Sequence, residues 1–182
     1  YKSFFYILGS NPGKGIQAHE KILVQSVAGI LLGIGLYSFA SRAVPGLLWI
    51  PLANTSIDIG MLIIPFAWLT VLLMSNAVNL ADGMDALAAN LLLMSFLGFL
   101  FIAIFKQDQK LVFLIASVIG SLLSYIYFNI PPARFQMGDV GSLAMGSLLA
   151  GIAFILGEPL MLLILCLPFV LVLLSTVVQG LG

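Results

Sequence analysis

Four polar side chains stand close together between two strongly apolar segments of the chain, in the stretch "NAVNLADGMDALAA": Asn76, Asn79, Asp82 and Asp85. Asn76 and Asn79 have the spacing that places two residues on one face of a helix. Gly83 tolerates the backbone angles that would end this helix. Asp85 stands where the N-cap of the next helix belongs, but capping explains neither Asp82 nor the asparagines. Ionisable groups at the edge of hydrocarbon are costly and usually serve a site or a pathway.

A second polar stretch, "YFNIPPARFQMGDVGSLAMGSLLAG", occupies residues 127–151. Asn129 ends an apolar segment, because the two prolines that follow prevent the helix from continuing. Asp139 then stands between glycines, which would let a ligand or metal approach the backbone. The next helix would offer its free N–H groups to an anion. The alternative is an ordinary helix start, with Asp139 or Ser142 as the cap.

Carboxylates gathered at one place repel each other unless protons or a divalent cation compensate their charge. A set of oxygen ligands suits Mg²⁺ or Mn²⁺, and Mg²⁺ typically takes one or two carboxylates together with substrate phosphates. The chain has a single cysteine and a single histidine, so it offers no zinc cluster. Lys21 stands just before an apolar segment, where it could meet a phosphate; the alternative is a lysine that extends toward lipid headgroups. Together these residues predict Mg²⁺-assisted phosphoryl transfer at a membrane surface.

The elements that carry these residues are expected to be membrane-spanning helices. The 182 residues are 62% hydrophobic and 8% charged, whereas a soluble domain has about 25% charged residues. Seven basic and seven acidic residues give a formal net charge of zero, which removes any argument for a nucleic-acid partner. The sequence therefore predicts an integral membrane protein embedded in the lipid bilayer.

Apolar segments of about 20 residues can each cross a bilayer as a helix. The sequence predicts an all-α, polytopic bundle of about six spans, forming one integral membrane domain over residues 1–182. Pro65 and Pro168 predict kinks, which neighbouring helices can accommodate. Because successive connections alternate between the two sides, both polar stretches should lie at the same membrane surface. The expected spans are 22–40, 59–75, 86–105, 111–128, 142–157 and 159–178.

"NAVNLADGMDALA" and "PPARFQMGDVGSLAMG" resemble the two aspartate signatures of the polyprenyl-phosphate N-acetylhexosamine-1-phosphate transferase superfamily. Within it, the chain is most similar to the phospho-N-acetylmuramoyl-pentapeptide transferases. Four features favour this branch: the Val of "NAVNL", the run "MGDVGSLAMG", the stretch "WIPLANTSIDIGMLIIPFAWLTVLLMSNAVN", and the Ser175 and Gln179 pair. By contrast, "FNIPPAR" is closer to the branch that transfers GlcNAc-1-phosphate.

The resemblance implies a Mg²⁺-dependent transfer of phospho-MurNAc-pentapeptide from UDP-MurNAc-pentapeptide to undecaprenyl phosphate. The products would be lipid I, for peptidoglycan synthesis, and UMP. It also implies a multi-pass protein of the bacterial inner membrane with its site on the cytoplasmic face, and it is compatible with a homodimer.

The resemblance further implies roles for individual residues. Asp139 matches the metal-binding aspartate of the family, and Asp82 matches the catalytic aspartate beside it, so we expect both at the metal. Lys21 matches a basic residue near the diphosphate. The remaining matches are substrate-binding positions. Asp85 and Asn129 match positions that contact the uracil nucleoside, and Leu80 and Gly83 match positions that line the same pocket. Asn76 matches a polar residue of the site. Gln136 stands where the family has an aromatic residue, and the adjacent Phe135 is the candidate to replace it in stacking on the base.

Two other functions remain open at this stage. One is a GlcNAc-1-phosphate or related transferase that uses the same lipid carrier. The other is a transporter or channel, which would place polar residues through the span interiors, whereas these spans hold isolated ones such as Gln25, Asn90 and Ser124. Family members have additional spans, a paired aspartate motif and a histidine-rich loop. We therefore expect the chain, from Tyr1 to Gly182, to be the middle of a larger transferase and inactive by itself.

Overall fold

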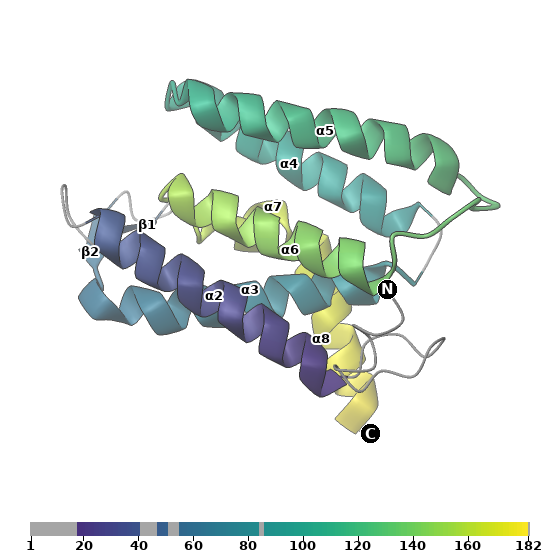
Figure 1. Ribbon diagram of the computed structural model, residues 1–182, viewed down its shortest axis with the longest axis horizontal. Helices are drawn as coiled ribbons and strands as arrows, with labels where there is room; N and C mark the ends of the chain where they lie inside the picture. Colours follow the sequence, from purple (N-terminus) through teal and green to yellow (C-terminus); the bar gives the residue numbers. More distant parts are fainter. Residues whose placement is uncertain (1–17, 41–46, 51–54, 84–85, 182) are drawn as a thin grey trace, which may run out of the picture.

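The computed structural model describes residues 18–40, 47–50, 55–83 and 86–181 and consists mainly of helices (Figure 1). The predicted all-α architecture is confirmed, apart from one short hairpin. In chain order the elements are α2 (Ala18–Ala40), β1 (Leu47–Ile50), β2 (Thr55–Asp58), a 3₁₀ turn (Gly60–Leu62), α3 (Ile63–Ala81), α4 (Leu87–Phe105), α5 (Gln109–Asn129), α6 (Gly138–Ile155), α7 (Met161–Leu165) and α8 (Leu167–Leu181).

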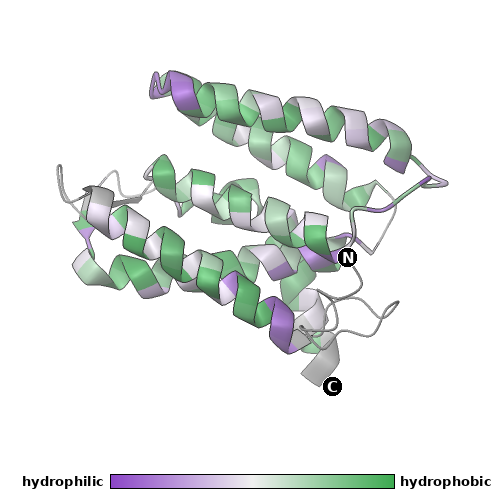
Figure 2. Cartoon of the chain, in the orientation of Figure 1, coloured by the Kyte–Doolittle hydropathy of each residue, from purple (hydrophilic) through white to green (hydrophobic). Residues whose placement is uncertain are grey.

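Five of the described helices are long and apolar enough to cross a membrane, which makes the chain a multi-pass membrane protein. Figure 2 shows hydrophobic residues along most of their length and hydrophilic residues gathered near their ends. These spans are His19–Ser38, Gly60–Ala81, Leu87–Phe105, Gln109–Asn129 and Gly138–Ile155. The first five predicted spans are therefore confirmed, although α3 continues to Ala81 and carries both Asn76 and Asn79 within its last turns.

The sixth predicted span is wrong as a single helix, because the chain divides there into α7 and α8 at Cys166. Pro168 lies in the first turn of α8, and a proline has no N–H with which to continue the hydrogen bonds of a preceding helix. The kink expected at Pro168 is thus confirmed. Pro65 produces no break, because α3 begins at Ile63 and a proline is tolerated in the first turn of a helix.

The connection between α2 and α3 contains an antiparallel hairpin that the amino-acid pattern did not predict. β1 pairs with β2 in a register that joins Leu47 to Asp58 and Ile50 to Thr55. β-branched and aromatic residues favour such strands, and "LLWI" and "TSID" contain them. The hairpin lies at the end of the bundle where α2 finishes and α3 starts (Figure 1).

α3 is the central helix and contacts α2, α4, α6 and α8. Glycines bring its neighbours close: a Cβ on Gly29 of α2 would lie 2.8 Å from the Cα of Trp68, and one on Gly146 of α6 would lie 2.6 Å from the Cα of Ser75. Small residues at such crossings are what allow membrane helices to pack closely. Beside the second crossing, the hydroxyls of Ser75 and Ser147 are 2.9 Å apart. The position of α3 is thus fixed on two sides by backbone contact.

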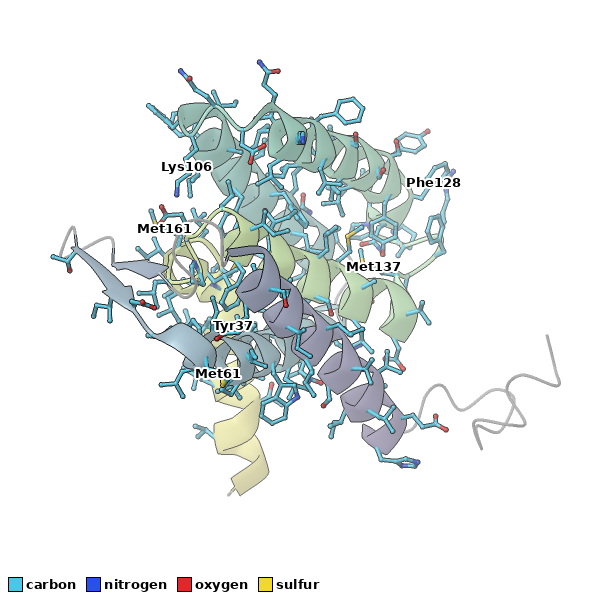
Figure 3. The ribbon with its side chains drawn as sticks, turned by 60° about the vertical axis from the view of Figure 1, so that its left-hand side comes forward. Tyr37, Met61, Lys106, Phe128, Met137 and Met161 are labelled. Atoms are coloured by element: carbon cyan, nitrogen blue, oxygen red, sulfur yellow. The ribbon has the colours of Figure 1, made fainter. Side chains whose placement is uncertain are left out.

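The bundle has two chemically different ends. Figure 3 places Lys106 and Met161 toward one end and Phe128 and Met137 toward the other. At the first end, the ammonium of Lys106 lies 2.6 Å from Oε1 of the buried Glu158 and donates to the carbonyl of Leu156. Both polar stretches of the sequence lie at the second end, as the alternation of spans predicts.

Candidate active site

Asp139 joins three helices at the second end of the bundle. It lies in the first turn of α6, whose first residue, Gly138, has a left-handed conformation with φ +66°. Nζ of Lys21, from α2, is 2.8 Å from Oδ1 of Asp139. Nδ2 of Asn79, from α3, donates to the same oxygen over 2.9 Å and to Oγ of Ser142 over 2.8 Å. Residues from distant parts of the sequence thus converge on one carboxylate.

Asp82 lies beside this group, at the C-terminal end of α3. Its Oδ2 accepts a hydrogen bond of 3.0 Å from the backbone N–H of Gly138, the residue before Asp139. Burial raises the pKa of Asp82 above its ordinary value of 3.8, the N–H of Gly138 lowers it, and the negative charge of Asp139 raises it. The expected convergence of the two carboxylates is confirmed, and their charges oppose each other.

The helix ends that hold these carboxylates differ from the capping alternatives that the sequence left open. α6 begins at Gly138 with Met137 at its N-cap and no side-chain cap, so neither Asp139 nor Ser142 is a cap. Ser142 is buried and donates instead to the carbonyl of Gly138 over 2.8 Å. The N-cap of α4 is Ala86, with φ +63° and no side-chain cap bond. Asp85 lies outside the described residues.

Asn76 faces α2, about one helical turn away from Asn79. Its Nδ2 donates to Oε1 of Gln25 over 3.0 Å and to the carbonyl of Leu72 over 2.8 Å. Gln25 is buried, and the sequence pattern presented it only as an isolated polar residue. Gln25 stands four residues after Lys21, so both lie on one face of α2. This spacing could have identified Gln25 as a residue of the site. The Gln25 and Asn76 contact aligns α2 with α3 next to the ion pair.

Asn129 ties the loop that follows α5 to the start of α4. Its Oδ1 accepts from the N–H of Ala86 over 2.8 Å, and its Nδ2 donates to the carbonyl of Phe135 over 3.1 Å. The side chain is 3% exposed. The structure therefore gives Asn129 a positioning role between two segments of the rim, while its contact with a nucleoside stays a prediction.

The other residues predicted to bind substrate lie on the rim of this end. Leu80 is 41% exposed at the end of α3, and a Cβ on Gly83 would meet only the carbonyl of Leu80 at 3.6 Å. Gln136 is exposed in the loop before α6. Phe135 is 51% exposed, and its ring packs against the rings of Tyr125 and Phe128 with centroid distances of 5.4 and 5.8 Å. An aromatic surface thus stands open beside the polar groups.

The carboxylates of Asp82 and Asp139 fit the requirements of a magnesium ion. Both offer oxygen atoms to a cation, both lie next to the N-terminus of α6, and each raises the cost of charging the other. A divalent cation would relieve that repulsion. The described residues hold no group of three or more Asp, Glu, His or Cys side chains that could hold a metal ion. Two carboxylates would leave coordination positions for phosphate oxygens and water, which is typical of magnesium sites.

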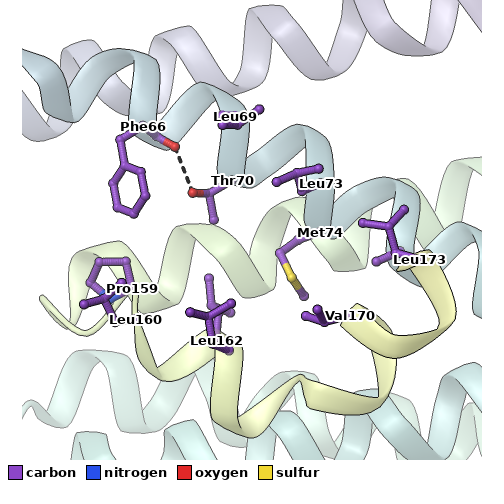
Figure 4. A pocket seen from close by; sticks show the side chains of 12 residues that line it. Phe66, Leu69, Thr70, Leu73, Met74, Pro159, Leu160, Leu162, Val170 and Leu173 are labelled. Carbon is purple, nitrogen blue, oxygen red and sulfur yellow. Dashed lines mark hydrogen bonds between the residues drawn. The ribbon is translucent and has the colours of Figure 1, made fainter. Parts of the chain in front are cut away.

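An apolar groove runs along α3 toward the same end (Figure 4). Its volume is about 200 Å³, and α7 and α8 form the wall that faces α3. Thr70 adds little polarity, because its hydroxyl donates to the carbonyl of Phe66 within the helix. Ala77, at the end of the groove nearest the site, precedes Asn79 by two residues. Other lining residues are Leu69 and Leu73 of α3, Leu162 of α7, and Val170 and Leu173 of α8.

Comparison with known proteins agrees with this arrangement. Curated proteins named phospho-N-acetylmuramoyl-pentapeptide-transferase are similar to the chain. The one from Listeria innocua is 33% identical over 91% of the chain and 50% of its own length. The one from Methylacidiphilum infernorum is 36% identical over 91% of the chain and 50% of its own length. The one from Wolbachia pipientis is 34% identical over 97% of the chain and 56% of its own length.

The chain thus spans about half the length of the curated relatives it matches. The family model for glycosyl transferase family 4 matches residues 13–157. This range includes Lys21, Asn79, Asp82 and Asp139, whose side chains converge in the structure. The chain belongs to glycosyl transferase family 4.

Proposed function

We propose that the protein transfers a phospho-sugar from a UDP-sugar to a polyprenyl phosphate and releases UMP. The donor is UDP-MurNAc-pentapeptide, the acceptor is undecaprenyl phosphate, and the product is lipid I. The observation that carries this proposal is the convergence of Lys21, Asn79, Asp82 and Asp139 at the end of an apolar groove. The names of the relatives supply the donor sugar.

The reaction joins two anions. An oxygen of the lipid phosphate attacks the β-phosphorus of the UDP-sugar, the bond from that phosphorus to the bridging oxygen breaks, and the electron pair leaves with UMP. Lys21 supplies a cation beside Asp139, and Asn79 holds Asp139 in place. Magnesium bound by Asp82 and Asp139 would neutralise charge on the pyrophosphate and the departing UMP. Positioning and charge stabilisation are the main contributions of a protein to phosphoryl transfer.

The groove along α3 suits the isoprenoid chain of the acceptor. Its lining is almost entirely apolar and comes mainly from side chains of α3, α7 and α8. α3 also carries Asn79 and ends at Asp82. In this proposal a lipid chain lies in the groove and its phosphate extends past the C-terminal end of α3 to the carboxylates. This supports a membrane-embedded phosphate as the acceptor rather than water or a soluble alcohol.

Phe135 is the proposed platform for the uracil base. The ring is half exposed, and the amide of Asn129 holds its backbone carbonyl at 3.1 Å. Stacking on an aromatic face is sequence-tolerant and contributes about 1–3 kcal/mol for a base. In this arrangement Phe135 takes the place of the aromatic residue that the family has at the position of Gln136.

The decisive experiment offers the complete purified protein undecaprenyl phosphate and Mg²⁺ with either UDP-MurNAc-pentapeptide or UDP-GlcNAc, and follows release of UMP. We expect UMP from the first donor and the muramoyl pyrophosphoryl lipid as its partner product. UMP from UDP-GlcNAc alone would assign the alternative transferase activity. If the protein releases no UMP from either UDP-sugar and also binds neither UDP-sugar, the transferase proposal is refuted.

We further propose that the end bearing Asp139 faces the bacterial cytoplasm, because nucleotide sugars are cytoplasmic substrates. Gln136 and Gln107 are both exposed, and they lie beyond opposite ends of α5, Gln107 in the turn from α4 and Gln136 in the loop to α6. In intact cells, a membrane-impermeant maleimide should label Gln107→Cys but not Gln136→Cys, and should label both once the cells are opened. The reverse pattern in intact cells would place the site outside.

A further inference from the structure

The break between α7 and α8 is held by a residue of α4. The single O–H of Ser95 has two carbonyl acceptors within reach: that of Leu165, the last residue of α7, at 3.2 Å, and that of Leu91, in its own helix, at 2.9 Å. Sγ of Cys166, at the break itself, lies 3.5 Å from the same hydroxyl. Ser95 and Cys166 are both buried. One hydroxyl thus contacts two consecutive residues at the point where the helix stops.

Gly98 provides the matching space three residues further along α4. A Cβ on Gly98 would lie 2.7 Å from Cδ2 of Leu165, so any side chain at position 98 would require the Leu165 side chain to shift. Residues three apart share a helix face. α4 therefore offers Leu165 a hydrogen-bond donor for its carbonyl and a hollow for its side chain.

The break needs such support because it lies among apolar helices. Leu165 is the last residue of α7, and the last carbonyls of a helix have no N–H partner within that helix. Pro168, three residues further on, has no N–H to offer any carbonyl. A carbonyl left without a donor in hydrocarbon costs several kcal/mol. The hydroxyl of Ser95 is a donor within 3.2 Å of the Leu165 carbonyl. The direction in which α8 leaves the break thus depends on α4 as well as on the α7 and α8 sequence.

We propose that Ser95 and Gly98 are positioning residues that set the direction of α8 and, with it, the width of the apolar groove for the lipid acceptor. The wall of the groove is formed by Leu162 before the break and by Val170 and Leu173 after it. The opposite wall is α3, fixed by its contacts with α2 and α6. The acceptor class, a long isoprenoid phosphate, rests on the proposed function, whereas the control of α8 by α4 does not.

The kinetic test compares Ser95→Ala and Gly98→Val with matched controls on α5. Ser117 of α5 is exposed, and its hydroxyl donates to the carbonyl of Phe113, four residues earlier in the same helix, over 2.8 Å. Ser117→Ala therefore removes a hydroxyl that makes the intrahelical contact but no contact between helices. A Cβ on Gly120 would have nothing within 4 Å, so Gly120→Val adds the same side chain without a clash. We expect Ser95→Ala to raise KM for undecaprenyl phosphate about threefold to tenfold, the range for one interhelical hydrogen bond. KM for the UDP-sugar should stay within about twofold in all four variants.

The structural test measures the α4 to α8 distance by pulsed electron paramagnetic resonance in nanodiscs. Spin labels are attached to cysteines that replace Phe101 of α4 and Leu174 of α8, which are both exposed. The native Cys166 is buried and should stay unlabelled. Protein without the added cysteines is the control for this. Ser95→Ala and Gly98→Val should shift or broaden the distance distribution, and Ser117→Ala and Gly120→Val should leave it unchanged.

The outcomes separate this inference from the proposed function. An unchanged distance distribution in both α4 variants overturns the control of α8 by α4, whatever the enzyme does. A shifted distribution with an unchanged KM for the lipid overturns the link to the groove. Should the protein release UMP from neither UDP-sugar, the proposed function fails, and the distance measurement still decides whether Ser95 and Gly98 position α8.

Discussion

The ammonium of Lys21 and the carboxylate of Asp139 meet at 2.8 Å and join the first turns of α2 and α6. Both side chains are partly exposed, and an ion pair of this kind contributes little to stability. Its importance lies in the charge it places next to the carboxylates. Lys21 offsets one of two neighbouring negative charges, and in the proposed reaction it would pair with a phosphate of the substrate.

Replacing Lys21 with methionine should lower kcat/KM for the UDP-sugar about 10-fold to 100-fold, the value of one charge-assisted hydrogen bond. Lys21→Arg keeps the charge and should recover part of the rate. Lys110→Met, at the opposite end of the bundle, removes an exposed lysine and should have little effect. Equal rates for Lys21→Met and Lys110→Met would show that Lys21 serves only the membrane interface.

Asp139→Asn should reduce transfer about 1,000-fold or more, because a bound metal stabilises transition-state charge by several kcal/mol. Membrane insertion should be unaffected. Asp108→Asn is a matched change at the other end, where asparagine can still cap α5, and it should keep full activity. Near-normal turnover by Asp139→Asn would exclude this residue from the metal site.

The raised pKa of Asp82 predicts a pH dependence of stability in buffer without divalent ions. The folded protein holds this proton more tightly than the unfolded chain, whose pKa is near 3.8, so the stabilisation is full below that pH. It is lost as pH rises through the folded-state pKa. Asp82→Asn removes the charge, so its Tm should exceed that of the parent increasingly as pH rises.

Magnesium provides a second measurement on the same pair. Mg²⁺ should raise the Tm of the parent near neutral pH, because an ion that binds the folded state stabilises it. It should not raise the Tm of Asp82→Asn or Asp139→Asn to the same extent. Equal shifts in all three proteins would mean that the ion binds elsewhere.

Phe135→Ala should raise KM for the UDP-sugar about tenfold, since stacking of one base contributes about 1–3 kcal/mol. The value of kcat should change less, because the base is remote from the reacting phosphorus. Phe113→Ala, which removes an exposed ring at the other end of α5, is the control. The same KM in both variants would show that the uracil base binds without Phe135.

Gly29→Val should destabilise the bundle by about 1–3 kcal/mol, the usual cost of overpacking. The new Cβ would lie 2.8 Å from the Cα of Trp68, and backbone cannot move aside as a flexible side chain can. Gly35→Val, in the same helix, has nothing within 4 Å of its Cβ and controls for helix propensity. Thermal unfolding of the two variants in detergent gives the comparison, and equal Tm values would contradict close packing of α2 on α3.

Hydropathy was sufficient to predict five of the helices, because a span is a local property of about 20 residues. The placement of Asp82 and Asp139 at the same end of the bundle followed from the alternation of connections. The bond from Asn79 to Asp139 and the contact between Gln25 and Asn76 could not be predicted, because each depends on the rotation of one helix against another. That rotation is fixed by Gly29 and Gly146, whose packing partners lie far away in the sequence.

The divided sixth span shows a different limit of sequence reasoning. Pro168 signalled a kink, but the size of the break depends on Ser95 and on the space beside Gly98, both on another helix. The hairpin between α2 and α3 was missed because its strands have four residues each, too short for a clear alternating pattern.

The continuity of α3 also fixes a distance. Ala77 lines the groove and Asp82 ends the helix, and five residues of α-helix advance by about 7.5 Å along its axis. The separation along α3 between the groove proposed for the lipid chain and the carboxylate of Asp82 is therefore set by a continuous stretch of backbone. A residue added or removed between Ala77 and Asn79 would turn Asp82 about 100° around the helix axis relative to the groove. We therefore expect insertions and deletions in this stretch to abolish transfer between the two substrates.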